Sequence, residues 1–295
     1  MISPRYININ RILAVATFLI SFVVYFDTMA PSVSYWDCGE FIAVSYTLGV
    51  PHPPGSPLFL LLGRIASMIP ISEDIAFRVN ILSPLVSASA VLFLYFIIVQ
   101  FVNHWRGKIE TNTDALIAFG AGIVGALTFA FTDSHWFNAV EAEVYAFSTF
   151  FTAIVVWLAL LWSEKADEKG NERYILIISY MIGLATGLHL LNLLTIPFVA
   201  LLIYFRKFKF EWASFGILVA LTGLVFFIIH NVIIKGMPKI ASAIGVPLTG
   251  ILIIAIFVGM VWAILNQKQL TSIVLTSMVL GGIKAVGFEI GRAHV

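Results

Sequence analysis

Long apolar runs, rather than a regular alternation of polar and apolar residues, dominate the chain. A helix needs about 20 mostly apolar residues to cross a bilayer. Backbone polar groups cannot stay unpaired in hydrocarbon, so such runs must be helical, and no stretch has the alternation typical of a membrane β-barrel. We therefore predict an all-α polytopic membrane protein. The expected spans are 12–29, 81–102, 115–131, 147–162, 212–234, 244–265 and 270–288.

Two further apolar stretches do not fit a single ordinary span. Stretch 57–69 is too short and carries Arg64 near its middle. Stretch 174–205 is too long, and glycine, histidine, asparagine and proline residues interrupt it between positions 183 and 197. We expect 57–69 to lie along the membrane surface and 174–205 to cross twice as a short hairpin, with a single crossing as the open alternative.

The distribution of basic residues favours this arrangement. Cytoplasmic loops carry an excess of Lys and Arg. With a cytoplasmic N-terminus, only Arg64, Arg78, Lys235 and Lys239 fall outside, whereas a crossing at 57–69 would move three basic loops to the outer side. The residues placed inside are Arg5, Arg11, Arg106, Lys108, Lys165, Lys169, Arg173, Arg206, Lys207, Lys209 and Lys268.

Composition supports the same class of protein. Hydrophobic residues make up 60% of the 295 and charged residues 11%, against about 45–50% and about 25% in soluble domains. A water-soluble fold of this size would lack polar residues to cover its surface. The single cysteine, Cys38, excludes an internal disulfide, a zinc knuckle and a CxxC redox site.

Both ends of the chain need separate interpretation. The apolar stretch after Arg11 resembles a signal peptide, but Pro31 directly after Ala30 disfavours cleavage, and we interpret it as an uncleaved anchor. Residues 289–295, Glu-Ile-Gly-Arg-Ala-His-Val, match what a common sequencing-adapter sequence would encode. We therefore expect the native domain to occupy 1–288, to be truncated there, and to be followed by a non-native tail.

The predicted topology brings chemically active side chains from three loops to one membrane face. These loops are 30–80, the segment before 147, and the tip of the proposed hairpin. Polar groups at such positions are costly, so they tend to be functional or to line a wet cavity. The candidate site residues are Trp36, Asp37, Glu40, His52, Arg64, Arg78, Glu141, Glu143 and His189.

Most of these residues also have a purely structural interpretation. Asp37 and Glu40 could be solvated loop residues, and Glu141 and Glu143 could cap the helix that enters the membrane, since a helix N-terminus favours carboxylates. His189 could be a packing residue. As a set they suit sugar transfer, in which a carboxylate takes the proton of an attacking hydroxyl. Arg64 and Arg78 could then bind a lipid phosphate, and Trp36 could belong to an interfacial aromatic belt.

Three sequence motifs resemble the domain-of-unknown-function 2723 (DUF2723) family. Its signature is an aspartate, a small residue, Gly-Glu-Phe, and then a His-Pro-Pro-Gly turn, as in Trp-Asp-Cys-Gly-Glu-Phe-Ile-Ala at 36–43 and Leu-Gly-Val-Pro-His-Pro-Pro-Gly at 48–55. Ala-Val-Glu-Ala-Glu-Val-Tyr at 139–145 and Gly-Leu-His at 187–189 resemble its next motifs. Cys38 departs from the Ser or Ala expected there. The resemblance covers most of 12–204.

The resemblance implies a GT-C membrane glycosyltransferase that uses a polyprenyl- or dolichyl-phosphate sugar, and the family's animal relative is a protein O-mannosyltransferase. It implies a bundle of about 8–9 transmembrane helices with short interfacial helices in the first outer loop. Asp37 would be the general base and Glu40 its neighbour, with His52, Glu141, Glu143 and His189 lining the cavity. Many bacterial members of the family carry a soluble region after the membrane part. This sequence lacks that region, which agrees with a truncated chain.

The predicted function is therefore inverting transfer of a sugar, such as mannose, to protein Ser or Thr hydroxyls. The expected partners are membrane lipid, the lipid-linked donor and a protein acceptor, with no nucleic acid. We expect the bacterial inner membrane, with the active face periplasmic. No metal ligand is assigned, and a need for a divalent metal stays open. The alternatives are a transporter or lipid flippase, and a non-catalytic assembly partner.

Overall fold

The computed structural model describes residues 2–53 and 55–266, and the regular secondary structure in these ranges is entirely helical. The prediction of an all-α polytopic membrane protein is confirmed. Six helical stretches in the described ranges are long and apolar enough to cross a membrane, namely Pro4–Asp27, Ile75–Arg106, Asn112–Ala130, Val144–Lys165, Leu190–Lys207 and Trp212–Ile244. The predicted span 270–288 and the tail 289–295 lie outside the described residues.

The chain divides into two compact units, Met1–Thr195 and Ile196–Val295, which are described separately. The first unit contains α1 (Pro4–Asp27), α2 (Cys38–Thr47), α3 (Pro57–Met68), α4 (Ile75–Asn80), α5 (Leu82–Arg106), α6 (Asn112–Ala130), α7 (Asp133–Ala139), α8 (Val144–Lys165), α9 (Glu172–Thr186) and η1 (Leu190–Leu194). The second contains α10 (Thr195–Lys207), α11 (Trp212–Phe227), η2 (Ile228–Ile234), α12 (Gly236–Ile244) and α13 (Val246–Asn266).

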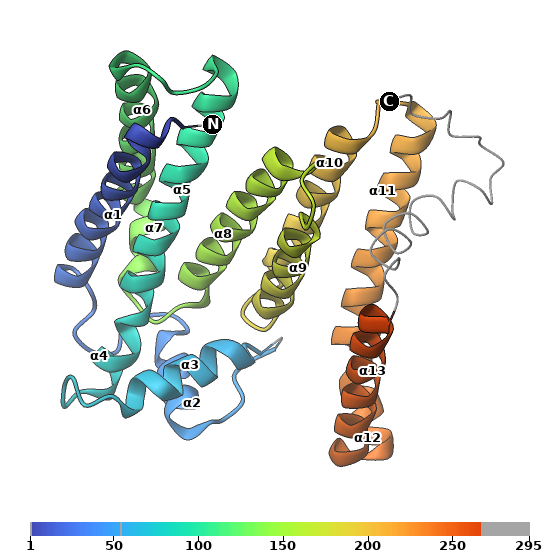
Figure 1. Ribbon diagram of the computed structural model, residues 1–295. Helices are drawn as coiled ribbons and strands as arrows, with labels where there is room; N and C mark the ends of the chain where they lie inside the picture. The colour runs from blue at the N-terminus through green and yellow to red at the C-terminus, as the bar shows by residue number, and fades with distance from the viewer. Residues whose placement is uncertain (1, 54, 267–295) are drawn as a thin grey trace. The chain divides into compact units, whose positions relative to one another are not determined.

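Helix α5 is the central helix of the first unit, because α1, α6 and α8 all pack against it and α9 packs on α8 (Figure 1). Small residues allow this close packing, as is usual between membrane helices. A Cβ atom on Gly122 of α6 would lie only 2.8 Å from ring and methyl atoms of Tyr95 and Val99 on α5. Two hydrophobic clusters form the core, one between α1, α5 and α6 and the other between α2, α3, α4 and α8.

In the first unit, the long helices α1, α5, α6, α8 and α9 alternate in direction, so their connections collect at two opposite ends of this bundle (Figure 1). At the end where α1 finishes, the Ala30 amide donates to the Val140 carbonyl over 2.8 Å. At the same end, the Ser56 hydroxyl donates to the Leu188 carbonyl over 2.8 Å. These bonds join segments 28–81, 131–143 and 187–194. Segments 2–3 and 107–111 lie at the opposite end, where the Ser3 amide donates to the Ile109 carbonyl.

The short helix α3 confirms that stretch 57–69 does not cross the bundle. Its 12 residues give a length of about 18 Å, against a hydrocarbon thickness of about 30 Å. The Asn80 side chain, at the entry to α5, donates to the carbonyls of Ala30 and Ser32, just beyond α1. The first outer loop therefore begins and ends at one end of the bundle, where Figure 1 also shows α2, α3 and α4.

Stretch 174–205 is broken into separate helices, as the interrupting residues predict. Helix α9 ends at Thr186, and η1 begins at Leu190 after a non-helical His189. The Asn192 side chain satisfies carbonyls freed by this break, because its amide donates to Ala185 and His189. With 15 residues, α9 is short for a full span. The double crossing stays a prediction.

In the second unit, α11 and η2 cover the predicted span 212–234, but the helix does not stop there. The helix continues from α11 through a π-helical turn, η2, into α12 and ends at Gly245, whose φ is +86°. Residues 235–244, expected as an outer loop with Lys235 and Lys239, are mostly apolar and helical. Pro238 in the first turn of α12 lacks an amide and crowds the preceding turn, and a wide π turn is a usual way to relieve this.

Candidate functional site

The candidate site is built on the beginning of α2 and the loop that follows it. Asp37 occupies the N-cap position of α2, and Glu40 lies in its first turn. Trp36, directly before, has φ +60° and is 83% exposed, and this left-handed conformation turns the chain into the helix. Leu48, with φ +53°, ends α2 and sends the chain back toward residue 52.

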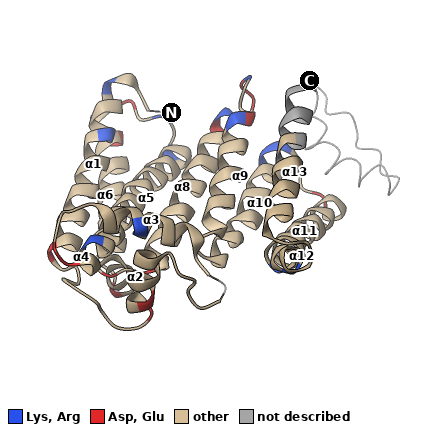
Figure 2. Cartoon of the chain, turned by 90° about the horizontal axis from the view of Figure 1, so that it is seen from below, with Lys and Arg blue, Asp and Glu red and all other residues tan. Residues whose placement is uncertain are grey.

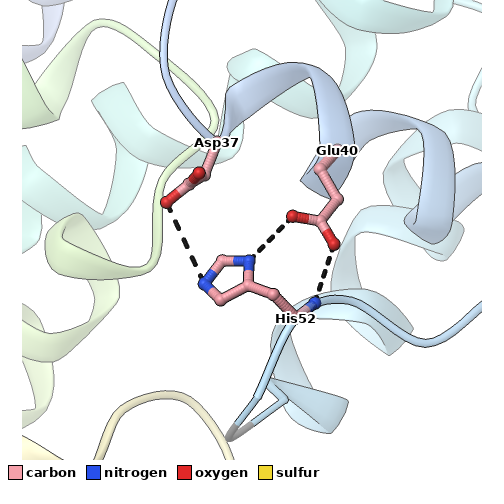
Figure 3. Close-up of side chains that lie close together, drawn as sticks. All are labelled: Asp37, Glu40 and His52. Carbon is pink, nitrogen blue, oxygen red and sulfur yellow. Dashed lines mark hydrogen bonds and ion pairs between the residues drawn. The ribbon is translucent and has the colours of Figure 1, made fainter.

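Asp37, Glu40 and His52 form one cluster (Figure 3). One oxygen of Glu40 accepts from the His52 backbone amide and the other lies against His52 Nδ1, each at 2.7 Å. On the other side of the ring, His52 Nε2 lies 3.9 Å from Asp37 Oδ2. The imidazole therefore lies between two carboxylates from the same helix end.

This arrangement favours a charged pair between Glu40 and His52. The hydrogen bond to Glu40 raises the pKa of His52, with further contributions from the charges of Glu40 and Asp37. The hydrogen bonds from the His52 side chain and amide lower the pKa of Glu40. Glu40 is thus fully engaged with His52, whereas Asp37 makes only the longer contact and its side chain is 58% exposed.

The same three residues supply ligand types that a divalent cation uses. Each offers one ligand atom, and the three atoms lie within 4.8 Å of one another. Carboxylate oxygen and imidazole nitrogen are common partners of transition metals. In the present geometry Nδ1 faces Glu40 and Nε2 faces Asp37, so a cation would have to displace the imidazole from one carboxylate.

A buried carboxyl group lies beside this cluster. Glu143 is 5% exposed, and burial raises its pKa to about 7, with the charges of Asp37 and Glu141 adding to the shift. Its carboxylate accepts from the Val144 amide, so Glu143 caps α8, as the structural interpretation of this residue predicted. The Cys38 thiol is 3.8 Å from its other oxygen, which links α8 to α2.

Glu141 is also buried, and its Oε1 has no hydrogen-bond partner within the described residues. His189 lies with its ring 5.2 Å from that of Tyr145, and its Nδ1 accepts from the Leu191 amide. Burial lowers the pKa of His189. His189 thus caps η1, and no hydrogen bond or ion pair of the described residues joins it to the cluster around His52.

Arg64 and Arg78 are bonded to the backbone of the first outer loop. Arg64 donates to the Tyr46 carbonyl over 2.6 Å, and Arg78 donates to the carbonyls of Ser67 and Ser72. Viewed onto this end of the bundle, basic residues lie on α3 and α4 and acidic residues on α2 (Figure 2). Neither arginine bonds to the cluster in the described part of the chain.

Two positioning residues were not predicted from the sequence. Asn80 holds the two ends of the first outer loop together, and Ser56 ties α3 to the segment before η1. Both act through bonds to backbone carbonyls far away in sequence. A lone asparagine or serine carries no signal for such a partner, so only the tertiary structure reveals them.

The bundle and the cluster at one of its ends define a polytopic membrane protein with a polar site outside its long apolar helices. The family described as "Protein O-mannosyl-transferase TMEM260 N-terminal domain" matches residues 37–212, a range that begins at Asp37 and contains every predicted site residue except Trp36. The chain belongs to this family, in agreement with the relation inferred from its motifs.

Two relatives are each similar to about two thirds of the chain. The protein O-mannosyl-transferase tmem260 of Dictyostelium discoideum is 31% identical over 205 residues, covering 64% of this chain and 23% of the relative. The mouse protein O-mannosyl-transferase TMEM260 is 27% identical over 209 residues, covering 71% and 28%. The chain thus spans about a quarter of these relatives. No solved structure matches it.

Proposed function

We propose that this chain is the membrane-embedded front part of a glycosyltransferase that moves a sugar, mannose by analogy with the named relatives, to Ser or Thr hydroxyls of protein. The donor is a polyprenyl-phosphate sugar, of the lipid-linked GT-C type. Transfer takes place at the outer, periplasmic face of a bacterial inner membrane. The observation that carries the proposal is the cluster of Asp37, Glu40 and His52 at one end of the bundle.

In the proposed step, the Asp37 carboxylate takes the proton from the acceptor hydroxyl. The hydroxyl oxygen forms a bond to the anomeric carbon of the sugar while the bond from that carbon to the phosphate oxygen breaks. The phosphate leaves with the electron pair, and the configuration at the anomeric carbon inverts. A base must be within hydrogen-bond reach of the proton that it takes, and the exposed Asp37 is open to an acceptor.

Asp37 suits the role of base better than Glu40 does. Both oxygens of Glu40 are occupied by His52, and its lowered pKa makes it a weaker base. Asp37 makes a single longer contact to the same ring. In this proposal Glu40 orients His52, and His52 holds the charge of Asp37 in place before proton transfer.

The Asp37→Asn variant of the full-length protein tests this assignment. The amide keeps the size of the side chain and cannot accept the proton, so transfer of labelled mannose from polyprenyl-phosphate mannose to a Ser/Thr peptide should fall by about 10²–10⁴-fold. Asp27→Asn, an exposed aspartate at the end of α1, is the matched control and should keep activity. Full transfer by Asp37→Asn would exclude Asp37 as the base.

A transporter or flippase is the second candidate, because α9 and η1 form a broken helix of the kind that transporters use near the bilayer midplane. The break is bonded to the first outer loop, since the Leu58 amide donates to the Gly187 carbonyl. Its position with the outer-end loops favours sugar transfer. Substrate uptake into proteoliposomes without sugar transfer would favour a transporter. The absence of both uptake and sugar transfer would favour an assembly partner.

A further inference from the structure

A hollow lies at the same end of the bundle as the cluster of Asp37, Glu40 and His52. It is a cavity of about 310 Å³ between the end of α6, helix α7, the start of α8 and η1. This volume is at the lower end of the range of small-molecule sites, about 300–1,000 Å³. None of the sequence-predicted site residues lines it. Its lining includes Phe129, His135, Asn138, Tyr145, Ser148 and Leu191.

The cavity lining is uncharged. It consists of hydroxyl groups, one carboxamide, aromatic rings and aliphatic carbon, with no Asp, Glu, Lys or Arg among the described residues that line it. Burial lowers the pKa of His135 to about 4, so its imidazole is neutral at physiological pH. An uncharged lining offers no counter-charge for a phosphate or a carboxylate, so it favours a neutral polar ligand.

His135 belongs to the cavity lining and has an unpaired ring nitrogen. The residue is only 6% exposed, and its Nε2 has no hydrogen-bond partner within the described chain. The other hydrogen bond of the ring goes to the backbone of Ser87. An unpaired buried nitrogen is costly. Because the protein itself covers Nε2, a ligand hydroxyl would pair with it only after the ring or a neighbouring side chain moves.

We propose that this cavity binds an uncharged pyranose ring, the sugar that the neighbouring cluster transfers. A pyranose has apolar C–H faces that pack on aromatic rings and hydroxyl groups that bond to hydroxyls and amides, and the cavity supplies both in Tyr145, Phe129 and Asn138. Tyr145 follows by two positions Glu143, whose carboxylate contacts the Cys38 thiol next to Asp37, so this wall of the cavity is tied to the cluster through the chain. The site rests on the proposed function for its choice of mannose as ligand.

Saturation-transfer NMR on the full-length protein in nanodiscs, with methyl α-mannopyranoside as the probe, tests this site. The wild-type protein should transfer saturation to the sugar protons. Ser148→Phe should fill the cavity and abolish the signal, and Asn138→Ala should weaken it severalfold without adding bulk. Thr128→Phe, a similar change at an exposed α6 position outside the cavity lining, should leave it unchanged.

Further experiments distinguish the donor sugar from the product sugar as the ligand. They also distinguish a failure of the sugar site from a failure of the proposed function. An O-mannosyl threonine peptide that gives a stronger signal than methyl α-mannopyranoside assigns the site to the product sugar. A peptide that gives no signal assigns it to the donor sugar, whose phosphate would then lie outside the uncharged lining. Asp37→Asn should lose transfer and keep the sugar signal. The sugar site is wrong if both Ser148→Phe and Asn138→Ala leave sugar binding unchanged. It is also wrong if the protein binds only an unglycosylated Ser/Thr peptide. Neither result would contradict the role of Asp37.

Discussion

His52 bonds differently to the two carboxylates of the cluster, those of Glu40 and Asp37. Its ring and amide occupy both oxygens of Glu40, while its far nitrogen reaches only to 3.9 Å from Asp37. Two nearby carboxylates would otherwise repel each other. The imidazole between them offsets this repulsion, and the exposed Asp37 side chain stays open to an acceptor hydroxyl.

The Glu40→Gln variant should lower the pKa of His52 toward its ordinary value of 6.5, because the main cause of the raised pKa is the hydrogen bond to Glu40. A group with a raised folded-state pKa contributes stability below its ordinary pKa and loses it as pH rises through the folded value. The charged pair should therefore weaken as pH rises above 6.5. Histidine side-chain NMR titration, with His52→Gln to assign the signal, measures this.

Glu73→Gln is the matched control for that titration, since it removes an exposed carboxylate from the same outer loop without touching the cluster. Its His52 titration should follow the wild type. Equal His52 pKa values in Glu40→Gln and in the wild type would mean that the two side chains do not pair in the folded protein.

At the residue scale, the sequence could place Asp37, Glu40 and His52 in one loop but could not predict their pairing. That pairing depends on the left-handed Leu48 and on the path of the chain after α2. The sequence also grouped Arg64 and Arg78 with them by charge. In the structure both arginines donate to loop carbonyls. A pattern of side chains in the sequence does not predict hydrogen bonds to backbone carbonyls.

At the scale of whole elements, the contact between α6 and α5 sets how closely the bundle packs. Gly122 lies against Tyr95 and Val99, while Gly120, on the same helix, has open space where its Cβ would be. Overfilling a packed contact usually costs about 1–3 kcal/mol. A glycine in an open helical position instead destabilises by roughly 0.5–1 kcal/mol relative to alanine.

Gly122→Ala and Gly120→Ala should therefore change stability in opposite directions. Gly122→Ala should lower the thermal midpoint of the purified protein, because its new Cβ would collide with α5, and Gly120→Ala should keep or raise it. Unfolding followed by circular dichroism in detergent compares the two. A rise in the midpoint for Gly122→Ala would mean that the helices are farther apart than in this structure.

Two helix starts carry a local chemical signal. Thr111 and Asp114 form a capping box that starts α6 just before the predicted 115–131. Glu143 starts α8 just before the predicted 147–162. The continuation of α11 through a π turn to Ile244 was missed, because hydropathy alone does not distinguish a helical apolar segment from a short apolar loop.

At the scale of the whole molecule, charge asymmetry predicted which loops of the first unit share an end. The prediction worked because membrane helices alternate in direction, so assigning the basic connections to one side fixes the others. The hydrogen bonds from Ala30 to Val140 and from Ser56 to Leu188 join the three outer segments as that reasoning requires. The cavity beside His135 could not be predicted, because it depends on side-chain packing between four elements.

The orientation of these ends in the membrane can be tested by thiol labelling. Cys38 is fully buried, and burial raises the pKa of its thiol to about 12, so the wild-type chain should react little with a membrane-impermeant maleimide. Val50→Cys adds a thiol at an 88% exposed position of the first outer loop. Lys169→Cys adds one in the exposed connection between α8 and α9.

In cells whose outer barrier has been opened, we expect Val50→Cys to be labelled while the inner membrane is intact and Lys169→Cys to be labelled only after lysis. The positive-inside rule is the physical reason, because Lys165, Lys169 and Arg173 surround the second position. The reverse pattern would place the cluster of Asp37, Glu40 and His52 in the cytoplasm. Labelling of both before lysis would mean that the connections lie on one side of the membrane, against the alternation of α1, α5, α6, α8 and α9.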